Sequence, residues 1–469
     1  MKDILIVSTQ PQRFLDQINF AKNLMERTDT LNILFFIDAE VYSLYPYIVD
    51  HLEFKIINKV KNESKVQNCK SLKYILREKI KNKTTKKQRK QLRKYINTLK
   101  NTKLFTYRYK KQEKVFLEDL HTKYNQISKM IRENNIEVLL INGDRHLGLE
   151  PVFLKISKEL NIPSIIIYLV DYADEERIFH NDVITKKLNK NILTSSYILE
   201  SQYKLDYKVI KDSFYYPHSI GNALKKFGVL TSNPYVMGSG CSDILCLNNK
   251  YYKDLYVSRG VDENKIKVVG DGVYDHIYKR YLDKDAIKKK TLKKYKLDND
   301  KKIVIVALPQ LGEHNILPWD KHWEEINYLM KNLDDLNQNI LISLHPKMNR
   351  DRYLFLEEKY DCSILDERLA DVLPCADMFV ATFSSTVVWS VLCGINTVIV
   401  DFYGLNYTMY DFLNSIRKVD KKEELNTVLE ITLSENIDFS NDWKSLSKNE
   451  VFDGKTMQRY IKLINEVSK

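Results

Sequence analysis

The chain has 469 residues and a mass of 55.4 kDa, which is too long for one ordinary hydrophobic core and predicts two or three compact units. Apolar residues make up 44% and charged residues 29% of the chain, which excludes a wholly disordered or fibrous protein. No uncharged stretch approaches the roughly 20 residues of a membrane span, and the apolar run after Met1 is too short for a signal sequence. We therefore expect a cytoplasmic protein.

The net charge of +12 is concentrated in one segment. Between Lys70 and Lys114 the sequence has 18 Lys or Arg against two Glu, a net charge of +16, so the rest of the chain sums to −4. Apolar residues at helical spacing predict a basic helical insertion at about 60–114. Three interpretations stay open: a solvated insertion without a partner, a peripheral contact with anionic lipids at the inner face of the cell membrane or with a phosphorylated acceptor, and nucleic acid. Nucleic acid is the least favoured, because no nucleic-acid module is recognisable elsewhere.

In the first half of the chain, short apolar strands alternate with amphipathic helices, a pattern typical of βαβ units. The predicted strands are Ile4–Ser8, Asn32–Ile37, Val138–Ile141, Ser164–Val170, Asp243–Leu247 and Lys265–Val269. The predicted helices are Gln17–Glu26, Val115–Asn134, Val152–Leu160 and Tyr251–Arg259. The polar, lysine-rich stretch Tyr281–Lys302 is interpreted as a domain junction.

The same alternation restarts after the junction. Strands are predicted at Ile303–Leu308, Asn339–Leu344, Ser363–Leu365, Met378–Ala381 and Thr397–Val400, and helices at Trp323–Leu333, Arg352–Lys359, Leu369–Leu373, Val387–Leu392 and Lys455–Val467. The sequence thus predicts an α/β fold with one parallel sheet in each of two domains, at 1–285 and 286–454, followed by a C-terminal helix at 455–469.

Polar residues follow the strands of the second predicted sheet. In parallel sheets ligands bind beyond the carboxyl ends of strands, where helix N-termini attract anions. The residues at those ends, which we expect to face one cleft, are Pro309–Glu313, His345–Lys347, Thr382–Thr386 and Asp401–Tyr403. An imidazole after one strand, together with three hydroxyls at the helix start after another, predicts a binding site for a nucleotide-like anion. Neutral hydrogen-bond donors would hold this anion. A plain helix cap and a structural histidine are the alternatives. Neither G-x-G-x-x-G nor a Walker A sequence is present.

Three segments carry a family resemblance. They are Ile-Lys-Val-Val-Gly-Asp-Gly-Val-Tyr-Asp at 266–275, Leu-Ile-Ser-Leu-His-Pro at 341–346, and Asp-Val-Leu-Pro-Cys-Ala-Asp-Met-Phe-Val-Ala-Thr-Phe-Ser-Ser-Thr at 371–386. In order and spacing they resemble the second half of GT-B glycosyltransferases. More narrowly, they resemble the bacterial surface-polysaccharide group of sialyl-, polysialyl- and Kdo-type transferases and CDP-glycerol polymerases. The UDP-N-acetylglucosamine 2-epimerases share this fold.

The resemblance implies two Rossmann-like domains that face a central cleft, with the helix at 455–469 crossing back to the first domain. It also implies that His345 binds the donor phosphate and that Ser384, Ser385 and Thr386 hold phosphate or the adjacent sugar. Gln310, Gly312 and Pro346 would line the donor site. The epimerases carry a Ser-Gly-Gly stretch near the phosphate, whereas Ser384 is followed by Ser-Thr-Val, which favours a transferase.

Glycosyl transfer requires stabilisation of the leaving nucleotide and a base for the acceptor hydroxyl. His345 fits the first role. Asp144 and Asp171, each after a predicted strand, are candidates for the second in that order, with His146 and Glu175 beside them; a helix cap or a solvated loop is the alternative for each. Asp298-Asn299-Asp300 has the form of a metal-binding D-x-D, but it is interpreted as a surface turn. We expect neither a metal nor a cofactor.

The predicted function is metal-independent transfer of a sugar from a CMP-, UDP- or CDP-linked donor to a glycan or lipid-linked acceptor. The acceptor would belong to a capsule, a lipopolysaccharide or a glycoprotein. The alternative is a nucleotide-sugar epimerase or a CDP-polyol phosphotransferase on the same fold.

Overall fold

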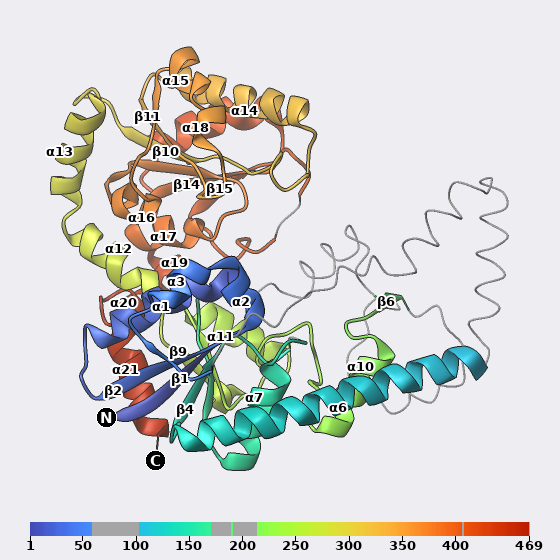
Figure 1. Ribbon diagram of the computed structural model, residues 1–469. Coiled ribbons are helices and arrows are strands. Elements are labelled where there is room, and N and C mark those ends of the chain that lie inside the picture. The colour runs from blue at the N-terminus through green and yellow to red at the C-terminus, as the bar shows by residue number, and fades with distance from the viewer. Residues whose placement is uncertain (59–102, 146, 170–188, 191–212, 406–407, 469) are drawn as a thin grey trace, which may run out of the picture. The chain divides into compact units, whose positions relative to one another are not determined.

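The computed structural model describes residues 1–58, 103–145, 147–169, 189–190, 213–405 and 408–468, which form two compact units (Figure 1). The first unit comprises Met1–Leu247, Lys253–Lys267 and Gln458–Lys469, and the second comprises Asn248–Tyr252 and Val268–Met457. Residues 59–102, which contain most of the predicted basic insertion, lie outside the described residues. The same holds for residues 170–188 and 191–212. The predicted placement of the two domains across a cleft stays a prediction.

The first unit is built on a sheet of seven strands in the order β3-β2-β1-β4-β5-β8-β9. Its strands are β1 (Lys2–Ser8), β2 (Leu31–Ile37), β3 (Lys55–Ile56), β4 (Val138–Ile141), β5 (Ser164–Ile166), β8 (Ile244–Leu247) and β9 (Ile266–Val268). The pairs from β3 to β8 are all parallel. Ile4–Ile6 and Val138–Leu140 pair in register at 1% exposure or less, and this complete burial explains why the strands read as continuous apolar runs.

Helices and two further strands complete the first unit. The helices are α1 (Pro11–Met25), α2 (Ala39–Leu44), α3 (Pro46–Asp50), α6 (Lys103–Glu133), α7 (Glu150–Leu160), α10 (His218–Phe227) and α11 (Lys250–Ser258), with a 3-10 turn at Glu263–Lys265. β6 (Asn189–Lys190) and β7 (Ser213–Phe214) form a separate antiparallel pair. Helices α1 and α7 each begin with proline in the first turn, where no N–H partner is needed.

Helix α6 extends twelve residues further toward the N-terminus than the helix predicted to begin at Val115. Its early turns pack against α10, as Figure 1 shows: Glu113 is buried and its carboxylate lies 2.6 Å from the Lys226 ammonium. Gln112 accepts a hydrogen bond from the Ser219 hydroxyl at 3.0 Å. The end of the basic segment, up to Lys114, is therefore part of a helix that packs on the first unit.

The second unit has a sheet of six parallel strands in the order β12-β11-β10-β13-β14-β15. The strands are β10 (Ile303–Ala307), β11 (Asn339–Ser343), β12 (Cys362–Ile364), β13 (Met378–Ala381), β14 (Asn396–Val400) and β15 (Ile416–Val419). In both units the first strand lies inside the sheet, and the strand order reverses beside it, between β1 and β4 and between β10 and β13. This is the doubly wound Rossmann order, so the α/β fold class expected from the sequence is confirmed.

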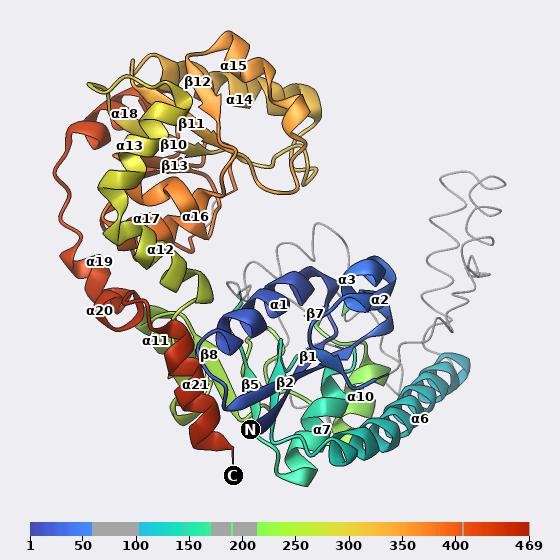
Figure 2. The ribbon, with the colours of Figure 1, turned by 60° about the vertical axis from the view of Figure 1, so that its left-hand side comes forward.

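Two hydrophobic cores lie on opposite faces of the second sheet. Alternate residues of β10 separate them: Ile303 and Ile305 belong to one core, and Val304 and Val306 to the other. The helices of this unit are α12 (Gly272–Leu282), α13 (Lys284–Tyr295), α14 (Trp319–Asp334), α15 (Phe355–Lys359), α16 (Leu369–Val372), α17 (Thr386–Cys393), α18 (Leu425–Ser434), α19 (Ser440–Ser445) and α20 (Lys448–Val451), with 3-10 turns at Arg350–Arg352, Leu373–Cys375 and Lys422–Glu424. Helices α12, α16 and α17 complete the first core, and α14, α15 and α18 complete the second. Figures 1 and 2 show α16 and α17 on one side of this sheet and α14 and α15 on the other.

The lysine-rich stretch Tyr281–Lys302 is mostly helix α13, which packs on the second unit. The Lys288 ammonium lies 2.9 Å from the Asp377 carboxylate, and Asp377 also accepts a hydrogen bond from the Ile303 N–H at the start of β10. The polar composition of this stretch predicted a junction between domains. In the structure the stretch forms a mostly exposed helix, and the Lys288–Asp377 ion pair holds it on the second unit.

Helix α21 (Thr456–Val467) starts with the backbone N–H groups of Thr456 and Met457 donating to the Asp275 carboxylate, at 2.8 and 3.2 Å. From Gln458 onward its residues belong to the first unit. There the Tyr460 hydroxyl accepts a hydrogen bond from the Tyr168 N–H at 3.0 Å, and its ring meets Phe20 edge-on. None of the described helices combines the length and the apolar character needed to cross a membrane.

Asp243, just before β8, holds the amino ends of β5 and β8 together. Its Oδ2 atom accepts hydrogen bonds from the Ser164 N–H at 2.8 Å, the Ser164 hydroxyl at 2.7 Å and the Ser157 hydroxyl at 3.1 Å. These bonds join β8 to the start of β5 and to α7.

We predict that Asp243→Ala lowers the free energy of unfolding by about 2 kcal/mol, because donors at the edge of the sheet lose a charged acceptor. Urea denaturation followed by circular dichroism measures the change. Asp254→Ala, which removes an exposed carboxylate of α11, is the matched control and should stay within about 0.5 kcal/mol of the wild type. Equal stability of the two variants would contradict the assigned role of Asp243.

Candidate functional site

The predicted phosphate-binding residues lie at one edge of the second sheet. His345 follows β11 by two residues, Gln310 follows β10 by three, and Ser384 follows β13 by three. The strands are adjacent in the order β11-β10-β13 and parallel, so their carboxyl ends meet at the same edge. The strand order reverses between β10 and β13, which is the position where ligands bind in doubly wound sheets.

His345 presents a proton donor at this edge. Part of the residue is exposed to solvent, and its Nδ1 accepts a hydrogen bond from the Lys347 N–H at 3.1 Å. Partial burial of the ring lowers the pKa of His345 below the ordinary 6.5, and the nearby Lys347 and His314 lower it further, against an opposing effect of Glu313. The ring is therefore neutral at neutral pH, with its proton on Nε2, because Nδ1 already accepts a bond.

The Ser384–Thr386 segment opens helix α17. The Ser384 and Thr386 hydroxyls lie 2.7 Å apart, and the Tyr410 hydroxyl donates to the Ser384 carbonyl at 2.7 Å. Ser385 is the exposed N-cap residue, and its side chain makes no capping bond. The sequence predicted three hydroxyls at a helix start, and they are there: the Ser384 hydroxyl accepts a hydrogen bond from the Thr386 N–H at 3.4 Å, while the Ser385 side chain caps no N–H group. The positive end of the helix dipole therefore faces outward beside Ser385.

The loop after β10 contributes residues with different roles. Gln310 is buried, and its Nε2 has no hydrogen-bond partner among the described residues. Gly312 packs under Trp319: a Cβ at this position would lie 2.9 Å from the indole ring, so only glycine fits. Glu313 accepts a hydrogen bond from the Tyr353 hydroxyl at 2.6 Å, which links this loop to the segment after β11. Pro346 is exposed beside His345.

A pocket of about 210 Å³ opens next to this edge, between the ends of β13 and β14 and the segment from Tyr410 to Leu413. It is lined by Thr382, Phe383, Ile399, Asp401, Tyr410, Asp411, Leu413, Ile416 and Lys418. Asp401 is buried, and its Oδ1 accepts a bond from the Leu405 N–H at 3.0 Å. Tyr410 connects the pocket to Ser384 through the hydrogen bond described above. Sequence reasoning placed Thr382, Phe383 and Asp401 at strand ends but missed the wall from Tyr410 to Leu413, because this wall lies in a loop without periodic pattern.

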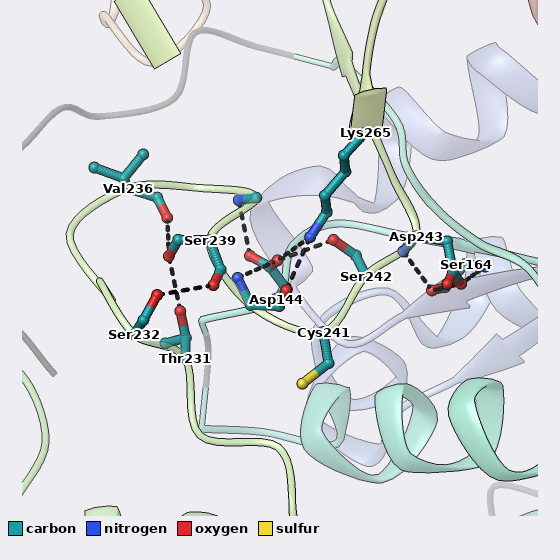
Figure 3. A network of polar contacts seen from close by, with 12 residues as sticks. Asp144, Ser164, Thr231, Ser232, Val236, Ser239, Cys241, Ser242, Asp243 and Lys265 are labelled. Atoms are coloured by element: carbon teal, nitrogen blue, oxygen red, sulfur yellow. Dashed lines mark hydrogen bonds and ion pairs between the residues drawn. The ribbon is translucent and has the colours of Figure 1, made fainter. Parts of the chain in front are cut away.

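In the first unit, Asp144 is the centre of the buried network in Figure 3. Its Oδ1 accepts a hydrogen bond from the Gly238 N–H at 2.9 Å, and its Oδ2 accepts from the Gly240 N–H at 2.8 Å and from the Ser242 hydroxyl at 2.9 Å. The Lys265 ammonium lies 3.5 Å from Oδ2, and the Asp144 side chain is 0% exposed.

The loop over Asp144 depends on glycine. Gly238 has φ +86°, and a Cβ at Gly240 would lie 2.7 Å from the Asp144 carbonyl oxygen. The carboxylate thus holds a tightly wound loop, and its lone pairs are directed at that loop. We infer that Asp144, the first candidate for the base, has a structural role. Asp171, His146 and Glu175 lie outside the described residues.

No group of His, Cys, Asp and Glu side chains with metal-binding geometry occurs in the parts of the chain that the structure describes. The Asp298 carboxylate accepts a hydrogen bond from the Asp300 N–H at 2.9 Å, the geometry of a surface turn.

Comparisons with known proteins found similar solved structures only at low sequence identity. No protein family matches the sequence, and no curated protein is significantly similar to it. Among solved structures, UDP-GlcNAc 2-epimerase from Methanocaldococcus jannaschii has a TM-score of 0.48 at 11% identity, over 99% of this chain and 100% of that one. The wall teichoic acid polymerase TagF has a TM-score of 0.47 at 12% identity, over 99% and 88%. A glycosyltransferase from Rickettsia africae ESF-5 has a TM-score of 0.47 at 12% identity, over 99% and 98%.

We predict that Asp144→Asn lowers the free energy of unfolding by about 2–4 kcal/mol, because an amide nitrogen would replace an acceptor in a fully buried network of donors. Urea denaturation measures this loss. Asp29→Asn, in an exposed turn of the same unit, is the control and should be neutral. A variant with wild-type stability but without enzymatic activity would contradict the structural role and restore Asp144 as a base.

Proposed function

We propose that the protein is a glycosyltransferase whose second unit binds the nucleotide of an activated sugar without a metal ion. The observation that carries this proposal is the pairing of two neutral donors at one sheet edge. These are the Nε2–H group of His345, after β11, and the N-terminus of α17 at Ser385, after β13. Both lie beside the point where the strand order reverses.

Such an arrangement suits a phosphate. A helix N-terminus supplies free N–H groups and a favourable dipole, and a neutral imidazole donates a hydrogen bond that does not require a protonated ring. When the bond between the sugar carbon and the phosphate oxygen breaks, its electron pair moves to the phosphate. Fixed donors aimed at that oxygen stabilise the growing charge, and this preorganised stabilisation is the main catalytic contribution that we assign to His345.

The neighbouring pocket suits part of a nucleoside. Its carboxylates, Asp401 and Asp411, would repel a phosphate but accept hydrogen bonds from ribose hydroxyls or a base amino group. Phe383 and Tyr410 supply aromatic surface for the flat base. A volume of about 210 Å³ is smaller than the roughly 300–1,000 Å³ of pockets that enclose whole ligands, so the transferred sugar would lie outside it.

The proposed donors are CMP-, UDP- or CDP-linked sugars, and the acceptor is a surface glycan or a lipid-linked glycan. A nucleotide-sugar epimerase or CDP-polyol phosphotransferase is the second candidate. The sequence between Thr382 and Val387 favours transfer, because it lacks the Gly-Gly of the epimerases that it resembles. The three activities differ in product: transfer releases free nucleotide, epimerisation changes the sugar of the donor, and polyol transfer releases CMP from a CDP-polyol.

We predict that His345→Ala and Ser384→Ala each lower turnover at least tenfold, because each removes part of the phosphate-binding edge, while the melting temperature stays close to that of the wild type. Nucleotide release from UDP-N-acetylglucosamine, CMP-N-acetylneuraminate and CDP-glycerol is measured with a panel of glycoside acceptors.

Matched controls are His51→Ala and Ser434→Ala, which change exposed residues away from this edge. Wild-type turnover in both site variants would remove this edge from the catalytic site. Interconversion of the sugar without nucleotide release would replace transfer by epimerisation.

The basic segment is proposed to bring the enzyme to an anionic surface. We predict that changing Lys86, Lys87 and Arg89 together to Gln lowers association with phosphatidylglycerol vesicles about 100-fold, because each cation near such a surface contributes about 1 kcal/mol. Vesicle co-sedimentation measures association. Changing the exposed Lys289, Lys290 and Lys293 of α13 to Gln removes the same charge and is the control. An equal effect of both triple variants would show that net charge, and not this segment, governs association.

A further inference from the structure

A carboxylate without a counter-ion lies beside the proposed phosphate-binding edge of the second unit. Glu313 belongs to the loop that follows β10, and His345 follows β11, the adjacent parallel strand. β10 and β11 pair in register up to Ala307 and Ser343, so the two loops leave the sheet next to each other. Glu313 also acts on the His345 ring through its charge, which opposes the lowering of the His345 pKa.

A chain of hydrogen bonds fixes the position of this carboxylate. Its Oε1 accepts from the Tyr353 hydroxyl at 2.6 Å, and the same hydroxyl lies 3.0 Å from Nε2 of His322. Tyr353 and His322 are both 0% exposed, and burial lowers the pKa of His322, so this ring is neutral at neutral pH. Since the Tyr353 proton goes to Glu313, Nε2 of His322 carries a proton and donates to the tyrosine oxygen. Two buried side chains therefore hold Glu313 in one place.

The charge of Glu313 is not neutralised within the described part of the chain. Its Oε2 is buried and has no hydrogen-bond partner among the described residues, and none of their Lys or Arg side chains forms an ion pair with it. Its one hydrogen-bond donor is a neutral hydroxyl. The residue is only partly exposed, so solvent and salt screen its charge less than they screen a surface carboxylate. Glu313 thus adds a negative potential at the edge where a phosphate is proposed to bind.

We propose that Glu313 is a specificity-determining residue, which makes the second unit favour the sugar-linked nucleotide over the free nucleotide. This role rests on the proposed glycosyl transfer and deepens it. In the donor, the phosphate next to the sugar is a diester with one negative charge. When the bond from the sugar carbon to this phosphate breaks, its electron pair stays on the phosphate. The acceptor oxygen forms the new bond to the sugar carbon, and in the net reaction its proton is released to water.

The leaving phosphate is a monoester with a second pKa of about 6, so it carries almost two negative charges at neutral pH. The fixed charge of Glu313 repels this form more strongly than it repels the diester. The free nucleotide therefore leaves, and the next donor binds in its place. No substrate has to reach the buried oxygen of Glu313, because the effect acts through its charge, and all the contacts that position it lie within the second unit.

The expected size of the effect follows from electrostatics. At an effective dielectric constant of about 20, one additional charge at roughly 10 Å changes an affinity about tenfold. Lys347 and His314 also face this edge, since both lower the pKa of His345, and they attract every phosphate. They are unchanged when Glu313 alone is replaced, so the variant isolates its contribution.

The test measures nucleotide binding by isothermal titration calorimetry with the full-length protein. Three pairs are compared: UDP with UDP-N-acetylglucosamine, CDP with CDP-glycerol, and CMP with its methyl ester. The members of each pair share a base and differ by one negative charge on the terminal phosphate. The variants are Glu313→Gln, whose amide oxygen still accepts from Tyr353, and Glu313→Ala, which also removes the charge. Glu358→Gln, an exposed carboxylate of α15, is the matched control.

We expect both Glu313 variants to lower the ratio of the Kd of the free nucleotide to the Kd of its ester about tenfold. Most of this change should come from tighter binding of the free nucleotide. Glu358→Gln should keep the ratio within about twofold of the wild type, because its charge lies on the surface and is screened by solvent.

The outcomes separate this role from the proposed function. A ratio within twofold of the wild type in both Glu313 variants would overturn the role and leave nucleotide binding intact. An equal change in the affinity of both members of each pair would also overturn it, because Glu313 would then shape the loop without distinguishing charge. If the wild type binds none of the six compounds, the proposed function fails, and the role of Glu313 fails with it.

Discussion

Parallel pairing around a central strand is the constraint on which the candidate site depends. In the second unit, β10 pairs with β11 on one side and β13 on the other, in the same direction. The loops that follow these strands must therefore leave at one edge, although their residues are 35 or more positions apart in the chain, as for Gln310 and His345. The same holds for β1 and β4 of the first unit, which place Ser8 beside Asn142.

Two buried acidic residues follow β4, and they differ in their hydrogen-bond partners although they are close in the sequence. Asp144 and Glu150 are six residues apart, and both are almost fully buried. Asp144 has hydrogen bonds to both oxygens and a lysine nearby, so its charge is compensated and its geometry is fixed. Glu150 has neutral donors on one oxygen and none on the other. A carboxylate of the first kind holds a loop, whereas one of the second kind keeps a buried oxygen without a hydrogen-bond partner.

Most strands of the described residues could be predicted from sequence because they are buried on both faces and read as apolar runs; β4 and β13 have the predicted boundaries. β15 was missed because its residues, Ile416–Val419, include Arg417 and Lys418 at the sheet edge, and α10 was missed because it follows a long segment without periodic pattern. Reading strand ends predicted that His345 and Ser384 lie at one edge of the second sheet, and β11 and β13, which precede them, do end at the same edge. Gly312, expected to line the donor site, packs under the Trp319 ring. The hydrogen bonds of Glu150 could not be predicted, because its two partners, Thr9 and Gln10, lie about 140 residues away in the chain. No local pattern records such a contact.

The central claim is that His345 and the start of α17 hold the phosphate of a nucleotide. A crystal structure of the protein soaked with CDP or UDP tests it most directly. Our account predicts a phosphate oxygen within about 3.2 Å of His345 Nε2, another near the Ser385 N–H, and the ribose beside Asp401. A nucleotide bound at any other edge of either sheet, with His345 Nε2 in solvent, would contradict it.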